Sequence, residues 1–181
     1  GRVRAPRLAL PDGCDHLLTP YLYPSTMPQA RILQVNVSPG GVPKRAVAAA
    51  EVRRDGITTD DVNYPKVHGG PERAVSLFSL EGIRRLQDEG HPIYPGATGE
   101  NLTVAGLDWA ALAAGTRLRV GDEVRLELAK EAEPCKSIAG AFADGNSKRI
   151  KAERFPGEAR WYARVLAEGT VRPGDAVEVE A

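Results

Sequence analysis

The chain has 181 residues, enough for one domain with a buried core, and its 42% hydrophobic and 27% charged residues are typical of globular proteins. Its 24 basic residues equal its 24 acidic residues, so no nucleic-acid partner is expected. The longest apolar stretches, at residues 46–50 and 109–114, are far shorter than the roughly 18 residues of a membrane span. We therefore expect a protein without a membrane partner.

The cysteine content indicates a reducing compartment. Only Cys14 and Cys135 carry thiols, too few for a secreted domain built on disulfides. The chain does not open on a basic segment followed by an apolar run and a cleavage site. A cytoplasmic location is the expectation, and a disulfide between Cys14 and Cys135 is the alternative to two free thiols.

The first 30 residues differ from the rest, because they hold five prolines and show no sustained hydrophobic period. Pro20, Pro24 and Pro28 recur every four residues, which precludes a stable helix there. We expect residues 1–30 to be a peripheral N-terminal extension and residues 31–181 to be the domain. An arm packed in an ordered way on the domain is the alternative.

Short strands separated by turns follow from residue 31. Leu33, Val35 and Val37 alternate with Gln34 and Asn36, which predicts a half-buried strand ending at the turn of residues 38–41. Residues 46–52 and 73–80 are further strand candidates. A short helix is predicted over residues 80–89, capped by Ser79, buried through Ile83 and Leu86, and stopped by Gly90.

The second half of the chain repeats this pattern. Asp108 can cap a short helix that ends at Gly115. Residues 116–120 and 123–128 read as a hairpin around Gly121-Asp122, and residues 161–166 lead through glycine turns to a last strand at 176–179. Many short strands, glycine turns and two or three small helices predict a mainly β, barrel-like domain.

Cys135, in the run Glu133-Pro134-Cys135-Lys136, is the strongest candidate for chemistry. A thiol followed by a cation can be held partly as the thiolate, which is a nucleophile and a soft metal ligand. The alternative is an inert cysteine that serves as a small buried apolar residue. Since no second cysteine lies at metal-clip spacing, a structural zinc site is disfavoured.

Two polar glycine motifs precede Cys135. His68 is followed by Gly69-Gly70 and lies between the cations Lys66 and Arg73, and glycines beside charges let the backbone approach an anion. Gly99-Glu100-Asn101 offers an acceptor and an amide that could orient a polar heterocycle. The plain alternatives are a turn with a structural histidine in the first motif and a capped strand start in the second.

Other catalytic signatures are missing from the sequence. It has no glycine-flanked serine elbow, no dinucleotide fingerprint and no P-loop.

The ordered set of motifs resembles the MOSC domain, the family named after the C-terminal domain of molybdenum cofactor sulfurases. The matching residues are the turn Ser38-Pro39-Gly40-Gly41-Val42-Pro43-Lys44, the motif His68-Gly69-Gly70-Pro71, the motif Gly99-Glu100-Asn101-Leu102, and Pro134-Cys135. The resemblance covers about residues 31–180. It implies a mainly β, barrel-like fold and a stand-alone member of the family.

The resemblance also implies a cofactor and a set of site residues. Family members bind the molybdenum cofactor, a pterin dithiolene with a phosphate, or carry sulfur on the cysteine. Cys135 would be the molybdenum ligand or the persulfide carrier. The family's polar motifs fall on His68, Gly69, Gly70, Glu100 and Asn101, and we choose Lys44, Lys66, Arg73 and Arg164 for the anionic groups of the cofactor.

The chain departs from the family at two points. Val67 stands where some members carry a second histidine, which leaves the choice of substrate open. The 181 residues have no room for the pyridoxal phosphate domain with which sulfurases generate a persulfide.

Two functions from different classes follow from the resemblance. The first is a molybdenum-dependent reductase of N-hydroxylated compounds, in which Cys135 binds the metal, His68 acts as an acid, and a separate redox protein donates electrons. The second is a carrier that accepts sulfur from a cysteine desulfurase on Cys135. A third hypothesis leaves Cys135 buried and purely structural.

Overall fold

The computed structural model describes residues 29–61 and 69–180. Nearly all of the predicted N-terminal extension, with Cys14, lies outside the described residues, and so do Lys66 and His68.

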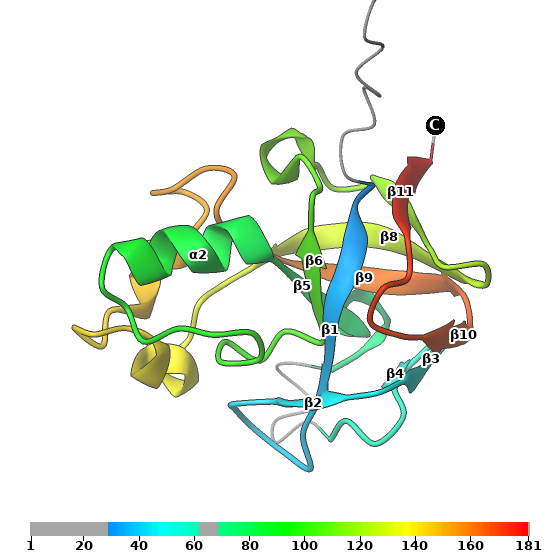
Figure 1. The fold of residues 1–181 in the computed structure, drawn as a ribbon, viewed down its shortest axis with the longest axis horizontal. Coiled ribbons are helices and arrows are strands. Elements are labelled where there is room, and N and C mark those ends of the chain that lie inside the picture. The colour runs from blue at the N-terminus through cyan, green and yellow to red at the C-terminus, as the bar shows by residue number, and fades with distance from the viewer. Residues whose placement is uncertain (1–28, 62–68, 181) are drawn as a thin grey trace, which may run out of the picture.

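Strands are the predominant regular elements of the described chain. They are β1 Arg31–Val37, β2 Arg45–Val47, β3 Ala50–Arg53, β4 Gly56–Ile57, β5 Val75–Ser79, β6 Leu102–Ala105, β7 Arg117–Val120, β8 Val124–Ala132, β9 Arg160–Ala167, β10 Gly169–Val171 and β11 Val177–Glu180. One sheet has eight strands in the order β11-β7-β8-β9-β5-β6-β1-β2, and a smaller one has the order β10-β3-β4 (Figure 1). Neighbouring strands are antiparallel except β5 and β6, which are parallel.

The large sheet curls until strands near its two ends meet. β11 is first and β1 seventh in the strand order, yet Ile32 N donates to Asp175 O at 2.8 Å and Val177 N donates to Ala30 O at 2.7 Å. β1 and β11 accordingly lie side by side (Figure 1). These contacts make the sheet barrel-like, as predicted, and they enclose a core that includes Ile32, Leu77, Phe78 and Leu126.

The α-helix α2, Leu80–Asp88, lies between the parallel strands β5 and β6 in sequence. Ser79 Oγ accepts from Gly82 N at 3.1 Å at its start, and Ile83 and Leu86 are buried, as predicted. At its end Gly90 N donates to Gln87 O and His91 N donates to Leu86 O, the paired bonds of a Schellman motif around a left-handed glycine.

The other described helices are short 3₁₀ turns: η1 Pro71–Arg73, η2 Trp109–Ala111, η3 Lys136–Ala141 and η4 Ser147–Ile150. The helix predicted to run from Asp108 to Gly115 shrinks to η2, because Leu112 is already extended and the Asp108 side chain makes no capping bond. None of the helices among the described residues is long and apolar enough to cross a membrane.

The alternation predicted for β1 holds at Val35, which is buried in the core, but fails at Leu33 and Asn36. Leu33 is 36% exposed, whereas its neighbour Ile32 and the polar Asn36 are fully buried. The pairing of β1 with β6 shifts register between Ile32 and Gln34, which changes the face on which the preceding residues lie. Asn36, predicted to face outward, is also buried, and its Nδ2 donates to Thr103 Oγ1 at 3.2 Å.

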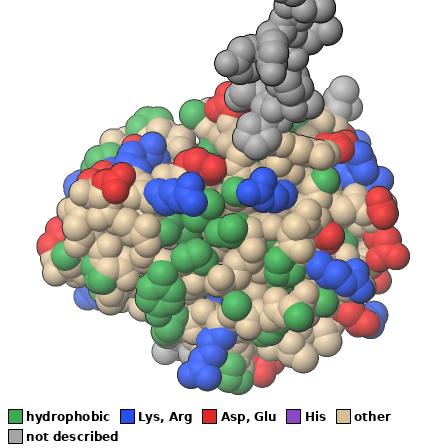
Figure 2. Space-filling model, viewed as in Figure 1, with side chains coloured by type: hydrophobic (Ala, Val, Ile, Leu, Met, Phe, Trp, Pro, Cys, Tyr) green, Lys and Arg blue, Asp and Glu red, His purple; other side chains and the backbone are tan. Residues whose placement is uncertain are grey.

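The strand predicted over residues 46–52 is two strands in different sheets. β2 pairs with β1, whereas β3 pairs with β10 and β4. The chain bends at Ala48, between them. On the outer surface, basic and acidic side chains are intermixed over the face that Figure 2 shows, in keeping with their equal numbers.

Candidate functional site

A cavity of about 400 Å³ lies where several turns and strand ends converge. Its volume is within the range of small-molecule sites, roughly 300–1,000 Å³. The lining residues come from segments far apart in the sequence, namely residues within 40–44, 55–61, 69–76, 98–101 and 135–138, with Arg160 and Tyr162 of β9. Segments that are distant in the sequence therefore come together to form one site.

Five of the candidate residues chosen from the sequence line this cavity: Lys44, Gly69, Arg73, Asn101 and Cys135. Gly70, Glu100 and Arg164 are described but are not among the lining residues. Lys66 and His68 lie outside the described residues, so their predicted place beside Cys135 stays a prediction.

Cys135 follows the end of β8 and immediately precedes η3. The residue is partly exposed and its thiol is free, and Ser137 and Ile138 of the same turn also line the cavity. This exposure argues against the reading of Cys135 as a buried inert residue. The neighbouring Lys136 is exposed and is not a lining residue, so the described cations of the cavity are others: Lys44, Arg73 and Arg160.

Glu100 holds the turn that forms one edge of the cavity. It is fully buried, and its carboxylate accepts from Gly96 N at 2.6 Å, Thr98 Oγ1 at 2.8 Å and Thr103 Oγ1 at 3.2 Å. Because three protein donors already bond to this carboxylate, its role is to hold the structure and not to bind a ligand. It stabilises the turn from behind the cavity.

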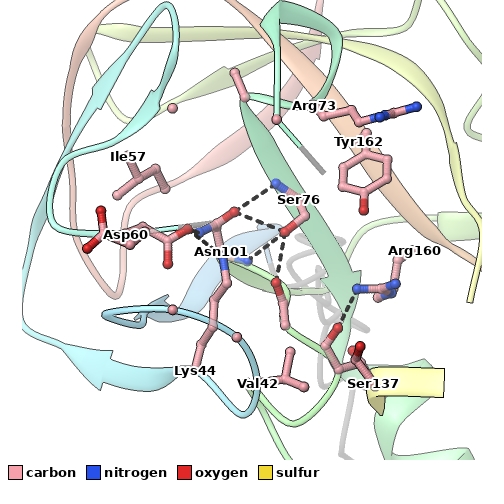
Figure 3. A pocket seen from close by; sticks show the side chains of 18 of the residues that line it. Val42, Lys44, Ile57, Asp60, Arg73, Ser76, Asn101, Ser137, Arg160 and Tyr162 are labelled. Carbon is pink, nitrogen blue, oxygen red and sulfur yellow. Dashed lines mark hydrogen bonds and ion pairs between the residues drawn. The ribbon is translucent and has the colours of Figure 1, made fainter. Parts of the chain in front are cut away.

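Asn101 is fixed in the wall of the cavity (Figure 3). Its Oδ1 accepts from Ser76 N at 3.0 Å and lies 2.9 Å from Ser76 Oγ. Its Nδ2 donates to Asp60 Oδ2 at 2.7 Å and to Asn36 O at 3.3 Å. The amide therefore joins β5 to the turn that carries Asp60.

Asp60 and Lys44 form a partly buried ion pair in the same wall, with Nζ and Oδ2 2.5 Å apart. The other oxygen of Asp60 accepts from Ser38 N at 2.9 Å. Burial lowers the pKa of Lys44 below its ordinary value of 10.5, and the Asp60 carboxylate opposes this by stabilising the charged form.

The ion pair leads to a prediction about the pKa of Lys44. The folded pKa lies below 10.5, so the unfolded chain binds more protons between the two values, and stability from this group rises with pH up to 10.5. We expect Asp60→Asn to lower the pKa of Lys44 further, because it removes the carboxylate charge. Side-chain ¹⁵N NMR of Lys44 measures this, and an unchanged or higher pKa in the variant would contradict it.

Arg160 is the main residue of the site that sequence reasoning missed. It is 4% exposed, its Nη1 donates to Thr98 O, and its buried Nε has no hydrogen-bond partner among the described residues. Arg160, Tyr162 and Arg164 occupy alternate positions of β9, while Trp161 and Ala163 between them are buried core residues. The alternation of these polar residues with apolar ones is visible in the sequence, and it could have indicated that Arg160 and Tyr162 lie on the face of β9 opposite to the core.

Arg164, which we had chosen instead, lies farther along the same strand. It forms ion pairs with Glu72 at 3.0 Å and with Glu127 at 3.4 Å. Its charge is thus matched by protein carboxylates outside the cavity lining.

No group of three or more His, Cys, Asp and Glu side chains in the described parts of the chain is arranged to hold a metal ion. Cys135 is the only soft donor among the described lining residues.

Comparison with known families identifies the family to which the chain belongs. The profile of the MOSC domain matches residues 64–178, more than half of the chain. The chain belongs to the MOSC domain family, as its motifs indicated.

Individual proteins are similar to the chain in sequence. An uncharacterised protein, YflK of Bacillus subtilis (strain 168), is 32% identical over 141 residues, which are 77% of this chain and 62% of YflK. A protein of Gibberella moniliformis named "Reductase" is 30% identical over 116 residues, 62% of this chain and 20% of that protein. The chain thus spans less than two thirds of the length of these relatives.

Solved structures share the fold. YiiM of Geobacillus stearothermophilus superposes with a TM-score of 0.66 at 24% identity, covering 84% of this chain and 75% of YiiM. The YUAD protein of Bacillus subtilis gives a TM-score of 0.67 at 19% identity, covering 83% of this chain and 95% of that protein. These similarities support the barrel-like architecture.

Proposed function

We propose that the chain binds the molybdenum cofactor in this cavity through Cys135 and reduces N-hydroxylated compounds. The observation that carries the proposal is a partly exposed cysteine with a free thiol, lining a cavity of about 400 Å³ whose lining also includes cationic side chains. Membership of the MOSC family and similarity to a protein named reductase support it.

The residues present fit such a cofactor. A thiolate is a soft ligand suited to a metal that arrives with sulfur ligands of its own, and Cys135 would provide it. Arg73 and Arg160 line the cavity and would attract anionic groups, while Gly69 beside Arg73 leaves room for the backbone to approach a phosphate. Lys44 would contribute less charge, because Asp60 neutralises it. Gly70, Lys66 and Arg164 stay secondary candidates.

When bound, the metal would supply a two-electron redox change. Cleaving an N–OH group to N–H consumes two electrons and two protons and releases water. A separate electron-donor protein would supply the electrons, and His68 remains our candidate for the acid that protonates the leaving oxygen. The chain's own wall of Ser76, Asn101 and Asp60 would keep the cavity in shape, because those side chains bond to each other.

Metal analysis of protein produced in a molybdenum-replete host tests the proposal. We expect molybdenum to copurify with the wild type and its content to fall at least about tenfold in Cys135→Ala. Losing a residue that ligates the metal should lower metal affinity by no less than losing a residue that only hydrogen-bonds to a ligand. The matched control is Cys14→Ala, the same change at the only other cysteine. Equal molybdenum in Cys135→Ala and wild type would refute the proposal.

A sulfur carrier is the second candidate, favoured by the free thiol and partial exposure of Cys135. In that function the Cys135 thiolate attacks the outer sulfur of a desulfurase persulfide, and the desulfurase cysteine leaves as a thiolate. Intact-mass analysis distinguishes the two: one extra sulfur on Cys135 in metal-free protein indicates the carrier, whereas molybdenum without persulfide indicates the reductase.

A further inference from the structure

The charge of Arg160 is not matched within the described protein. Lys44 is paired with Asp60, and Arg164 is paired with Glu72 and Glu127. Arg160 is more deeply buried than either, at 4% exposed, yet it forms no ion pair with any described carboxylate. Buried charges are normally paired, because removing an ion from water is costly.

The hydrogen bonds of Arg160 are also incomplete. Nη1 donates to the carbonyl of Thr98, which holds the guanidinium against the 98–101 turn. Buried Nε has no partner among the described residues, although buried polar groups are nearly always bonded. A guanidinium offers several N–H groups in a planar fork that suits two oxygens of one carboxylate or phosphate.

Arg160 lines the same cavity as Cys135. Ala132 of β8 is its cross-strand partner, and the chain continues from Ala132 over two residues to Cys135. Figure 3 shows Arg160, Tyr162 and Ser137 on one side of the cavity and Lys44, Asp60 and Asn101 on the other. An anion bound to Arg160 would therefore lie on the Cys135 side.

We infer that Arg160 binds an anion in this cavity, and that the ligand held beside Cys135 carries a carboxylate or phosphate group. The binding of an oxyanion follows from residues of this chain and does not require molybdenum. The oxyanion has two possible sources, the phosphate of a cofactor or an acidic group on the substrate. If it belongs to the substrate, the substrates are acidic N-hydroxylated compounds, and that assignment rests on the proposed function.

The first test uses cofactor-free protein and inorganic phosphate. Calorimetry should show one phosphate per chain in the wild type and at least about tenfold weaker binding in Arg160→Gln, since a charge-assisted bidentate contact is lost. Arg160→Lys keeps the charge without the planar fork and should bind with intermediate affinity. Arg117→Gln removes a surface arginine that pairs with Glu127 outside the cavity, and it should bind as the wild type does.

A measurement on the wild type keeps the test decisive if Arg160→Gln does not fold. Phosphate should shift the Nε–H NMR signal of Arg160 and slow alkylation of Cys135 by iodoacetamide, both with the same midpoint. Absence of phosphate binding, or binding that leaves the Arg160 signal unmoved, would overturn the inference.

Molybdenum-loaded protein separates the two sources. If the cofactor provides the anion, loading abolishes phosphate binding and Arg160→Gln lowers the molybdenum content. If the substrate provides it, loaded protein still binds phosphate, Arg160→Gln keeps its molybdenum, and the preference for an acidic substrate over a neutral one of equal size is lost. Phosphate binding at Arg160 in protein that never takes up molybdenum would uphold the inference and refute the proposed function.

Discussion

Replacing Gly96 by alanine is expected to destabilise the domain by at least about 3 kcal/mol and to disrupt the cavity. Gly96 has a φ of 90°, and an added Cβ would lie 2.4 Å from Lys44 O, a backbone atom that cannot rotate away. Lys44 N also donates to Gly96 O at 2.9 Å, so the two segments cannot separate without breaking that bond. A loss of this size is a large part of the 5–15 kcal/mol that stabilises a typical domain.

Gly90→Ala is the matched control for Gly96→Ala. Its φ is 89°, yet nothing lies within 4 Å of an added Cβ there. It should cost only the strain of the left-handed conformation, about 1 kcal/mol. Urea denaturation of both variants measures the difference, and equal losses would show that the contact with Lys44 is not what requires glycine at position 96.

Local features of the fold could be predicted from the sequence. The bounds of α2 follow from the Ser79 cap, the buried pair Ile83 and Leu86, and the glycine at position 90, all within one short segment. The hairpin of β7 and β8 follows from the turn at Gly121 and the alternation on either side. In both cases the deciding interactions are between residues close in sequence.

Features set by distant residues could not be predicted. Ile32 rather than Leu33 enters the core because of the shifted pairing between β1 and β6, which the sequence of β1 alone does not encode. The division between β2 and β3 depends on β1 and β10, their partners in separate sheets.

The candidate site shows the same division. Cys135, Asn101 and Lys44 were found because each stands in a recognisable motif, and they line one cavity. Glu100 faces away from it because the positive φ of Gly96 and Gly99 turns the chain so that its carboxylate reaches Gly96 N and Thr98. Arg160 was missed because two features that distinguish it from Arg164, an unbonded buried Nε and the absence of an ion pair with a described carboxylate, arise only in the folded protein.

Replacing Asp60 by alanine is expected to cost about 3–5 kcal/mol, the range for removing one partner of a buried ion pair. The Asp60 and Lys44 side chains are only 6% and 11% exposed. The substitution leaves the Lys44 ammonium without its counter-ion, and it deprives Ser38 N and Asn101 Nδ2 of an acceptor. Asp61→Ala removes the neighbouring, exposed carboxylate and should change stability by less than about 0.5 kcal/mol.

A double-mutant cycle separates the unpaired charge from the lost hydrogen bonds. The pair Asp60→Ala with Lys44→Met should be less destabilised than Asp60→Ala alone, because no ammonium is then left unpaired. The loss of stability that persists in the double variant measures the contribution of the hydrogen bonds from Ser38 and Asn101 to Asp60.

The pH dependence gives an independent check on the same pair. Burial already lowers the pKa of Lys44, and removing the Asp60 charge lowers it further, which widens the interval up to 10.5 in which the unfolded chain binds more protons. The stability of Asp60→Ala should therefore rise more with pH above neutrality than that of the wild type, and the added Lys44→Met should abolish the excess. If Asp60→Ala instead follows the wild-type pH profile, the Lys44 ammonium finds another counter-charge in the folded protein, and the cavity wall does not depend on this ion pair.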